Sequence, residues 1–481
     1  MPSLWPCDWD ECPSPAVQRV GDCLLCDRHL CRFHLQEPWH GCPDPESNWS
    51  EYCAQYTAAE ARRLDTLCKR IDGTKLCERA SQVRSHGGSG INIPCSVDLS
   101  PRKLAAMMGG QNCHAEIKFD DGVEWLARFR LPGAASPPAE VRDYVLRSEA
   151  VTMQFLERRT RVPSPRVFDW ACESDPTNTI GVGYILVEKM PGTPLQWQSA
   201  TAVQKEKIVR QLAEIMLEIE RHPFEQLGSL VAAASDSQMQ LGGLAQHSTC
   251  RSGDGGKALG PFRSSRDAFR ALVEAHLRMI AAGEIGTADN ALDVFLAHRF
   301  RLDLLDQVSE SNGGERFFLK HADDKGDHIL VNADFDIVAI IDWECCSTTS
   351  RQEAFSSPCM MWPVAAFYDG SNELAQEELL LARVFRERGR DDLAHCVLNS
   401  RKVQRFLFGL GPDGSGQDAK TLLGLLKGLK RAFHGHGVET DADADAVEQA
   451  VEAEWENWKA EALQAREHEP LFKLMQQQTM K

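Results

Sequence analysis

FFLKHADDKGDHILVNADFDIVAIIDWE, residues 317 to 344, is the segment from which the architecture of this chain can be inferred first. It contains two short β-branched runs, Ile329 to Val331 and Ile337 to Ile341, which the turn-rich segment NADFD separates. Two such runs around a turn predict a β-hairpin. Asp323 precedes the first strand and Asp342 follows the second, so the hairpin brings both carboxylates to one end. Such a carboxylate pair suits a general base and a metal ligand.

The sequence upstream of this segment predicts a small lobe of strands with one helix. AEIKF (115 to 119) and EWLARFRL (124 to 131) flank the turn signal DDG, which predicts a second hairpin. A helix is expected from about Arg142 to Arg158, and GYILVEKM (183 to 190) predicts a further strand. From about Val203 onward helical patterns dominate. We therefore expect an α+β chain with a small β-rich N-lobe and a large helical C-lobe.

The loop before the first hairpin strand resembles the catalytic loop of the aminoglycoside phosphotransferase and choline kinase group, which are relatives of protein kinases. In that group the loop contains His-x-Asp with an Asn five residues after the Asp, whereas this chain has His321, Asp323 and then His328. The resemblance implies a bilobal protein-kinase-like fold in which Asp323 accepts the proton of the substrate hydroxyl and Asp342 chelates magnesium. It also implies that Lys325 lies near the transferred phosphate, where Ser/Thr protein kinases keep a lysine.

His328 is the residue at which the chain departs most from that pattern. A neutral imidazole can bind a metal ion but prefers softer ions than magnesium. The sequence therefore leaves two questions open: whether ATP is used with Mg²⁺ or with Mn²⁺, and whether catalysis survives the replacement of Asn by His.

A carboxylate on the apolar side of the predicted helix indicates a second part of the site. Glu149 lies on the same stripe as Leu146 and Met153, and a carboxylate turned inward needs a partner. The resemblance implies that this partner is Arg128, which lies mid-strand where kinase-like folds place the lysine that binds the α- and β-phosphates. Arg130 points to the same face of the strand and is kept as the alternative.

The resemblance implies nucleotide contacts at two further places. The strand that ends in Glu188, Lys189 and Met190 resembles the hinge whose backbone groups bind adenine, so Glu188 and Met190 are candidate contacts. Gly109 and Gly110, in MMGGQNCH ahead of a strand, are the candidate phosphate loop, although the predicted N-lobe at 91–191 contains no G-x-G-x-x-G motif.

The N-terminus contains a cluster of metal-binding residue types, with six of the seventeen cysteines in the first 42 residues. Zinc favours four thiolate or imidazole ligands, and two close pairs can supply the corners of one tetrahedron. The order and spacing of eight ligands resemble the AN-one-type zinc finger of ubiquitin-pathway and stress-associated proteins. Four protein ligands leave no open position, so both zinc ions are expected to be structural. A cross-braced arrangement assigns Cys7, Cys12, Cys31 and His34 to one zinc and Cys23, Cys26, His40 and Cys42 to the other.

These patterns predict four consecutive segments. They are an AN-one-type zinc finger at 1–45, a helical linker at 46–90, a kinase-like N-lobe at 91–191 and a helical C-lobe with the catalytic loop at 192–481. A capping box at Thr57 and Glu60 predicts where the linker helix begins. The Ser/Gly-rich stretch at about 231–259 predicts a surface insertion.

Composition argues against several classes of partner. Lys and Arg number 53 against 70 Asp and Glu, and the resulting net charge of −17 argues against a nucleic-acid partner. No stretch approaches the roughly 20 apolar residues of a membrane helix, and the N-terminus has no export or transit pattern. Seventeen cysteines without such a signal suit a reducing compartment. The expected location is the cytoplasm or also the nucleus, with no membrane partner.

The expected function follows from the resemblance: an ATP-dependent phosphotransferase that transfers the γ-phosphate to a hydroxyl of a small molecule. The alternative is a catalytically weak or inactive kinase-like adaptor that binds protein partners through the zinc finger. A protein kinase ranks third because an A-P-E segment is lacking. GSL at 228–230 and GPF at 260–262 resemble a fungal branch of the group. The acidic balance favours a cationic acceptor, such as an aminoglycoside or a choline-like compound.

Overall fold

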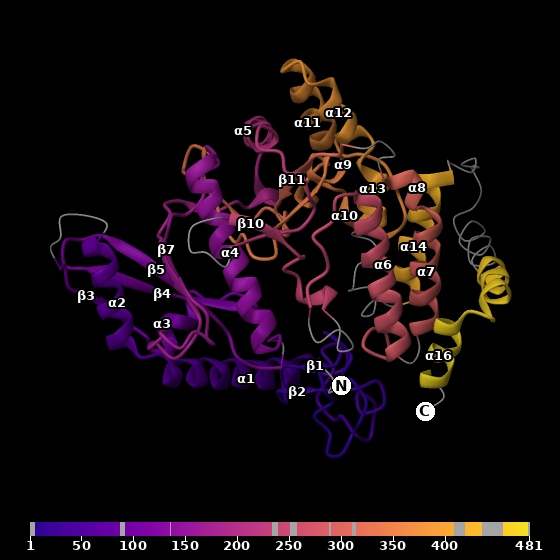
Figure 1. Ribbon diagram of the computed structural model, residues 1–481, viewed down its shortest axis with the longest axis horizontal. Helices are drawn as coiled ribbons and strands as arrows, with labels where there is room; N and C mark the ends of the chain where they lie inside the picture. The colour runs from indigo at the N-terminus through magenta and orange to yellow at the C-terminus, as the bar shows by residue number, and fades with distance from the viewer. Residues whose placement is uncertain are drawn as a thin grey trace.

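A computed structural model describes residues 5–86, 92–134, 136–232, 239–250, 257–287, 290–309, 314–407, 419–434 and 456–479. Figure 1 shows a β-rich lobe on the left, a helical lobe on the right and the N-terminal segment below and between them. The two-lobed α+β architecture that the sequence predicts is therefore present. The predicted insertion at 231–259 lies partly outside the described residues. Within the described residues no helix is long and apolar enough to cross a membrane.

The smaller lobe is built on a five-stranded antiparallel sheet with the order β3-β4-β5-β7-β6. Alternate residues of β4 and β5 are buried, and this alternation leaves Arg128 and Arg130 together on the opposite face. The predicted hairpin at 115–131 is confirmed. The strands are β3 (Cys95–Val97), β4 (Asn112–Phe119), β5 (Glu124–Arg130), β6 (Val167–Ala171) and β7 (Tyr184–Glu188).

Two helices, α1 (Trp49–Arg70) and α2 (Gly73–His86), cover the buried face of this sheet. Leu64 and Leu67 of α1 and Leu76 of α2 share one apolar core with the inward residues of β4 and β5. The described part of the segment 46–90, which the sequence indicates as a linker, is thus mainly helical but forms a layer of the lobe.

The predicted start of the first helix is wrong. Helix α1 begins at Trp49, where the side chain of Asn48 accepts a hydrogen bond from the backbone of Glu51 at 3.2 Å. Thr57 lies inside the helix and donates its hydroxyl to the carbonyl of Cys53 at 2.9 Å. Ser and Thr side chains often make this bond in helix interiors, so the Thr57 and Glu60 pattern does not mark a cap.

Helix α4 (Ala139–Arg159) joins the two lobes on the other side of the sheet, and Glu149 on it is only 2% exposed. Its apolar residues Met153 and Leu156 belong to a core that also contains Ile185 of β7 and Trp343 of the larger lobe. A short helix, α3 (Pro101–Ala105), lies in the connection between β3 and β4.

The predicted hairpin of the segment 317–344 is also present. Strand β12 (Ile329–Val331) pairs with β13 (Ile337–Ile340) and with β8 (Thr193–Pro194). The flanking strands β11 (Phe317–Lys320) and β14 (Ser347–Ser350) pair with each other. The loop between β11 and β12 therefore contains all the catalytic-loop candidates, and Asp342 follows β13 directly after Ile341.

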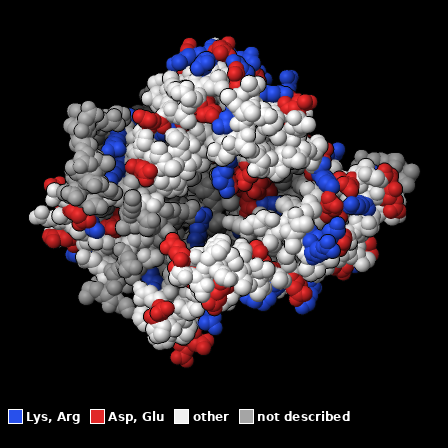
Figure 2. Space-filling view, turned by 180° about the vertical axis from the view of Figure 1, so that it is seen from behind, with Lys and Arg blue, Asp and Glu red and all other residues white. Residues whose placement is uncertain are grey.

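Helices make up most of the larger lobe, around a second apolar core between α6, α7, α14 and α16. Figure 2 shows acidic and basic side chains side by side around a hollow in the middle of the molecule. The helices are α5 (Ala202–Glu220), α6 (Ser265–Ala282), α7 (Ala291–Asp303), α8 (Leu305–Val308), α9 (Arg351–Ala354), α10 (Val364–Tyr368), α11 (Gln376–Glu387), α12 (Asp391–Leu398), α13 (Ser400–Leu407), α14 (Ala419–His434) and α16 (Pro470–Thr479). The remaining strands are β1 (Asp22–Cys23), β2 (Arg28–His29), β9 (Ser229–Ala232) and β10 (Met239–Gly242).

Candidate active site

The loop between β11 and β12 is tied to the end of the hairpin through His321. Its Nε2–H donates to the carbonyl of Ile341 at 2.9 Å, and its Nδ1 accepts from the backbone N–H of Asp323 at 3.1 Å. These two bonds fix the tautomer of the ring and the position of the loop. The Asp323 side chain is 49% exposed and pairs with Lys325 at 2.9 Å. The hydrogen bond that Lys325 donates to Asp323 raises the pKa of this lysine and keeps it charged.

Asp324, the next residue, has a different environment. Its carboxylate pairs with Lys320 at 3.0 Å and accepts from the backbone N–H of Cys359 at 3.0 Å. Burial opposes the charge of Lys320, but Asp324 raises the pKa of this lysine overall. Asp324 therefore joins the loop to the segment that follows α9, and Asp323 is the carboxylate of the two that a substrate can reach.

His328 is packed under the same loop and is 8% exposed. Its ring stacks on that of His321 with 4.2 Å between centroids, and its Nδ1 accepts from the backbone N–H of Gly326 at 3.4 Å. Burial lowers the pKa of His328 to about 2, so the ring is neutral. With Nδ1 as acceptor the proton lies on Nε2, so in this geometry the imidazole offers an N–H and no lone pair to a metal ion.

Asp342 follows the hairpin with a φ of 61° and a side chain that is 54% exposed. The next residue, Trp343, is buried and donates its indole N–H to the carbonyl of Ile340 at 2.9 Å. This anchor turns the carboxylate of Asp342 out of the core. An accessible carboxylate is a suitable ligand for magnesium, which prefers oxygen.

Arg128 brings the two lobes together. It forms an ion pair with Glu149 of α4, and its Nη2 lies 2.5 Å from Glu344 and 3.2 Å from Asp342. Burial opposes its charge, but the three carboxylates together raise the pKa of Arg128. Arg130, the alternative clamp, pairs with Glu344 and donates to Gln111 at 2.5 Å. Of the two arginines, Arg128 is the one that pairs with Glu149 of α4.

Glu344 is a site residue that the sequence analysis missed. Its carboxylate accepts from Asn112 at 2.8 Å and from both arginines. Although burial works against it, Arg128 and Arg130 lower the pKa of Glu344 to about 2. The sequence contained one signal for this residue. Glu344 and Asp342 flank Trp343, and a tryptophan that points into the core turns its two neighbours away from the core.

The predicted hinge contacts lie at the end of β7. The backbone N–H of Glu188 donates to the carbonyl of Arg166 at 2.9 Å, and its carboxylate accepts from the backbone of Arg166 at 3.3 Å. Lys189 pairs with Glu116 and Glu124, each at 2.6 Å. The Glu188 amide is therefore engaged within the sheet. Met190, which follows, is half-buried.

The predicted glycine pair lies in the turn that enters β4. The backbone N–H of Gly109 donates to the carbonyl of Asn112 at 2.8 Å. Neither glycine has a positive φ, and a Cβ atom on Gly110 would meet nothing within 4 Å. The backbone conformation therefore does not require Gly109 or Gly110, although both lie between β3 and β4 where a phosphate loop is expected.

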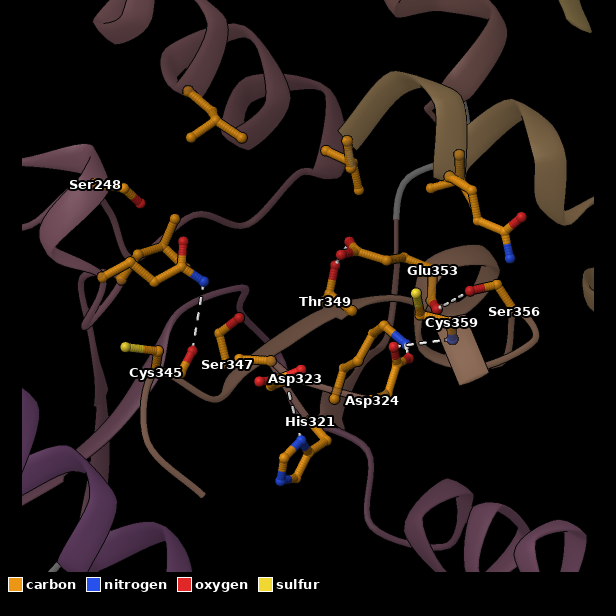
Figure 3. A pocket seen from close by; sticks show the side chains of 18 of the residues that line it. Ser248, His321, Asp323, Asp324, Cys345, Ser347, Thr349, Glu353, Ser356 and Cys359 are labelled. Atoms are coloured by element: carbon orange, nitrogen blue, oxygen red, sulfur yellow. Dashed lines mark hydrogen bonds and ion pairs between the residues drawn. The ribbon is translucent and has the colours of Figure 1, made fainter. Parts of the chain in front are cut away.

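A cavity of about 620 Å³ opens beside Asp323. Figure 3 shows Asp323, Ser347 and Thr349 facing the same space, with Glu353 on its wall. Helices α6 and α13 complete the walls. The cavity is large enough for a small-molecule ligand, and the accessible carboxylate at its edge makes it the candidate acceptor site.

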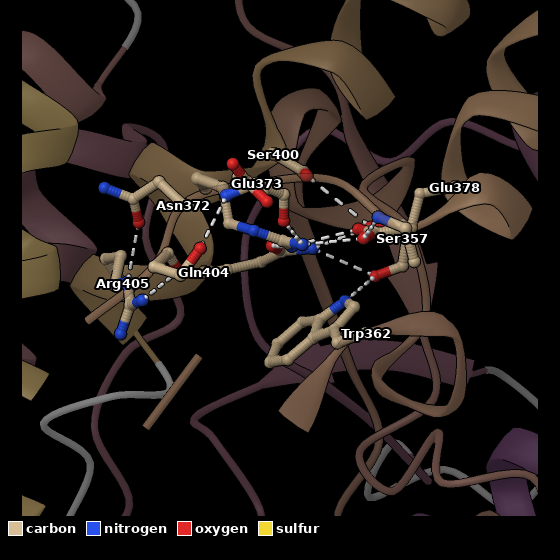
Figure 4. A network of polar contacts seen from close by, with 11 residues as sticks. Ser357, Trp362, Asn372, Glu373, Glu378, Ser400, Gln404 and Arg405 are labelled. Atoms are coloured by element: carbon tan, nitrogen blue, oxygen red, sulfur yellow. Dashed lines mark hydrogen bonds and ion pairs between the residues drawn. The ribbon is translucent and has the colours of Figure 1, made fainter. Parts of the chain in front are cut away.

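A buried polar network braces one wall of this cavity (Figure 4). Arg401 donates to the carboxylate of Glu378 at 2.6 and 2.9 Å, and Ser357 donates to the same carboxylate at 2.6 Å. The lining residues Trp362 and Gln404 both donate to the carbonyl of Ser357, at 2.9 and 3.0 Å. Because each lining side chain is held by a buried partner, this wall is preorganised.

The GSL and GPF segments, which are distant in sequence, lie side by side at the cavity. Leu227 and Phe262 exchange two backbone hydrogen bonds, at 2.7 and 2.8 Å. Gly228 donates to the Thr348 hydroxyl at 3.0 Å, and a Cβ atom there would lie 2.2 Å from the Gly242 carbonyl oxygen. Leu227, the residue that precedes GSL, lines the cavity and is held there by its two bonds to Phe262.

The N-terminal segment brings the predicted ligands into two groups. Cys7, Cys12, Cys31 and His34 form one, and Cys23, Cys26, His40 and Cys42 form the other, with the ligand atoms of each group within 4.8 Å of one another. The Sγ atoms of Cys7 and Cys31 each lie 3.4 Å from Nδ1 of His34. Zinc bonds of about 2.0–2.3 Å in a tetrahedron require edges of about 3.5 Å, so the residues fit zinc. His29 pairs with Asp22 instead.

This segment contacts both lobes. Arg32 donates to three carbonyls: Ile280 in the last turn of α6 at 3.0 Å, and Gly286 at 2.7 Å and Ile285 in the segment just after it. The carboxylate of Asp27 accepts from the backbone N–H of Ala134, in the smaller lobe, at 2.6 Å. Trp5 and Ala16 pack in one apolar cluster with Val141 and Val145 of α4 and with Ala245 and Cys250 of the larger lobe.

Comparisons with known proteins relate the chain to one family. The model of the phosphotransferase enzyme family (APH) matches residues 116–383. Subtelomeric hrmA-associated cluster proteins of two Aspergillus fumigatus strains are 35% identical over 135 residues, which is 28% of this chain. The chain spans about a quarter, 25%, of the length of these curated relatives.

Solved structures with a similar course of the chain include two small-molecule kinases. The GDP complex of aminoglycoside 2′-phosphotransferase-IIIa is 14% identical with a TM-score of 0.36, and the match covers 74% of this chain and 98% of that one. An ethanolamine kinase of Plasmodium vivax is 12% identical with a TM-score of 0.40, and the match covers 71% and 80% of the two chains.

Proposed function

Because this chain belongs to the phosphotransferase enzyme family, whose model spans residues 116–383, we propose that it transfers the γ-phosphoryl group of ATP to a hydroxyl of a small molecule. The observation that carries the proposal is the position of Asp323, an accessible carboxylate at the edge of a 620 Å³ cavity. Its loop is hydrogen-bonded to the strand end that also places Asp342 against Arg128. The candidate base, the cavity and the two paired arginines proposed to bind phosphate thus lie around one hairpin.

The residues have separate tasks in the transfer. The acceptor hydroxyl gives its proton to the Asp323 carboxylate while its oxygen forms a bond to the γ-phosphorus. The bond from that phosphorus to the β,γ-bridging oxygen breaks, and ADP leaves with the electron pair. Lys325 lies 2.9 Å from Asp323 and is placed to contact the transferred group. Arg128 and Arg130 offer planar, permanently charged donors to the other phosphates.

Asp342 is the residue that would hold magnesium. The metal, when bound, neutralises charge that develops on the phosphate oxygens. His328 does not supply the oxygen of the family's asparagine, so the second ligand position is weak in this chain.

ATP affinity should therefore depend on a divalent cation and improve when the second ligand is restored. We expect ATP to bind more tightly with Mg²⁺ or Mn²⁺ than with EDTA, and His328→Asn to strengthen the Mg²⁺ dependence, because an amide oxygen replaces an N–H. Titration calorimetry at fixed ATP and varied metal measures this. ATP binding that ignores metal in both proteins, together with no ADP formation, would leave only the adaptor alternative.

Glu344 should compete with the nucleotide for the two arginines. Glu344→Gln keeps the hydrogen bond from Asn112 but removes the negative charge, so ATP should bind about 1 kcal/mol, or roughly fivefold, more tightly. The exposed Glu140 in the first turn of α4, changed to Gln, controls for the loss of one negative charge and should leave ATP affinity unchanged. Weaker binding by Glu344→Gln would show that this carboxylate positions the arginines and does not compete with phosphate.

The N-terminal segment is proposed to be an AN-one-type finger with two structural zinc ions, and the chain to belong to the fungal branch with the GSL and GPF segments. The described contacts of Arg32 and Asp27 go to the two lobes of the same chain. These contacts favour a role of the finger in holding the lobes together over the alternative of a free adaptor module.

A further inference from the structure

The cavity beside Asp323 has an apolar end formed by residues of both flanking helices and two neighbouring segments. Phe269 and Leu272 come from α6, Val403 and Leu407 from α13, and Leu227 and Leu244 complete this side. Apolar walls favour ligand surface of the same kind, by about 25 cal/mol for each Å² removed from water. The same walls disfavour a ligand with several charges, which would lose its hydration.

Carboxylates of the described lining already have partners. Asp323 pairs with Lys325 at 2.9 Å and Asp324 with Lys320 at 3.0 Å. Glu353 accepts a hydrogen bond from the hydroxyl of Thr349, and burial raises its pKa above the usual range. With two lysines beside these acids, the described lining does not offer the surplus of ionised carboxylates that a polycation needs.

Among the described residues, the imidazole of one lining residue has no hydrogen-bond partner. His276 of α6 is 1% exposed, and within the described residues neither of its ring nitrogens has a hydrogen-bond partner. Burial and the nearby Arg301 lower the pKa of His276 to about 3, so its ring is neutral. A buried, unpaired polar group is unfavourable unless a ligand pairs with it. Each ring nitrogen has less than 1 Å² of accessible surface, so a ligand pairs with this imidazole only after the ring turns toward the cavity, where it then offers one donor and one acceptor.

We propose that the cavity binds a neutral, largely apolar alcohol that places one hydroxyl at Asp323 and hydrogen-bonds His276 with a second polar group. The proposal rests on the phosphotransferase function proposed above, because it names the class of acceptor for the same site. It replaces the expectation of a cationic acceptor, which followed from the net charge of the whole chain and not from the cavity. A ligand of this class combines apolar burial with two polar contacts, which fix its orientation.

Straight-chain alkanediols of increasing length, with a hydroxyl at each end, are suitable probes. Binding to the full chain is measured by the fluorescence of Trp362 and the other tryptophans and checked by calorimetry, with kanamycin and choline as cationic comparisons. We expect a diol of matching length to bind more tightly than the mono-alcohol of the same length and more tightly than either cation. Tighter binding of kanamycin or choline would overturn the proposal.

The part of His276 is tested with two variants. His276→Leu should weaken binding of the best diol about tenfold, as expected for one lost hydrogen bond of about 1.4 kcal/mol, and leave the mono-alcohol unchanged. His276→Asn keeps a donor and an acceptor and should retain part of the difference if the Leu variant does not fold. Equal diol binding in folded His276→Leu would overturn the contact.

Activity separates this proposal from the function on which it rests. Diol binding without ADP formation from ATP and Mg²⁺ would contradict the phosphotransferase function but support the class of ligand. ADP formation with kanamycin or choline, but with no diol, would support the function and contradict the class of acceptor.

Discussion

Replacing Asp323 by Asn should lower the turnover number by about 10²- to 10⁴-fold, the usual contribution of a general base. The amide has nearly the same shape as the carboxylate but cannot accept the proton of the acceptor hydroxyl. Because the residues proposed to bind the nucleotide lie elsewhere in the site, the dissociation constant of ATP should change little. The rate of ADP release in the presence of acceptor, together with an ATP titration, measures both quantities.

A neighbouring carboxylate of the same loop provides the matched control. Asp327 is exposed, and Asp327→Asn removes the same charge from the loop without touching the predicted base. The control should keep most of the wild-type rate. If both variants lose activity equally, the loss is caused by the changed charge of the loop and not by the removal of a base. If Asp323→Asn remains fully active, Asp323 is not the base.

The hairpin that carries this residue could be predicted because its signals are local. Two β-branched runs, a turn and flanking acids lie within 317–344, and β12 and β13 form the pairs that this pattern requires. The zinc-ligand groups could be paired for the same reason, since ligand spacing constrains which four side chains can meet. The roles of these residues in catalysis and metal binding stay predictions.

Features that depend on distant residues could not be predicted. The helices of 46–90 look like a linker because their sequence does not show that Leu64 and Leu76 will meet the inward side of β4. Glu344 becomes part of the candidate site only when β5 brings Arg128 and Arg130 against the end of the hairpin. The apolar end of the cavity forms where α6 and α13 approach each other. The net charge of the whole chain contains no information about this local surface.

Removing zinc from the N-terminal segment should destabilise the whole chain and not this segment alone. Structural zinc contributes about 10–16 kcal/mol to the folding of comparable peptides, so a chelator or Cys31→Ser should unfold the segment. Val141 and Val145 of α4 would then lose Trp5 as a neighbour, and the end of α6 would lose Arg32. Native mass spectrometry should find two zinc ions in the intact chain, and thermal unfolding with and without chelator should show a lower midpoint for the lobes.

Arg32→Ala separates the contact with the lobes from the binding of zinc. The variant should keep both zinc ions, because Arg32 is not a ligand, but should lose the three bonds to the carbonyls of Ile280, Ile285 and Gly286 in and just after the last turn of α6. Each such bond contributes about 0.5–1.5 kcal/mol to stability, and a cation at a helix C-terminus interacts favourably with the helix dipole. We therefore expect Arg32→Ala to lower the unfolding midpoint and to weaken ATP binding. Arg28 is an exposed arginine of the same segment whose guanidinium lies over the ring of Trp9, so Arg28→Ala acts within the segment and should leave ATP binding unchanged. If Arg32→Ala unfolds like the wild type, and the zinc-free chain still binds ATP normally, then the segment is an independent module and the adaptor alternative regains support.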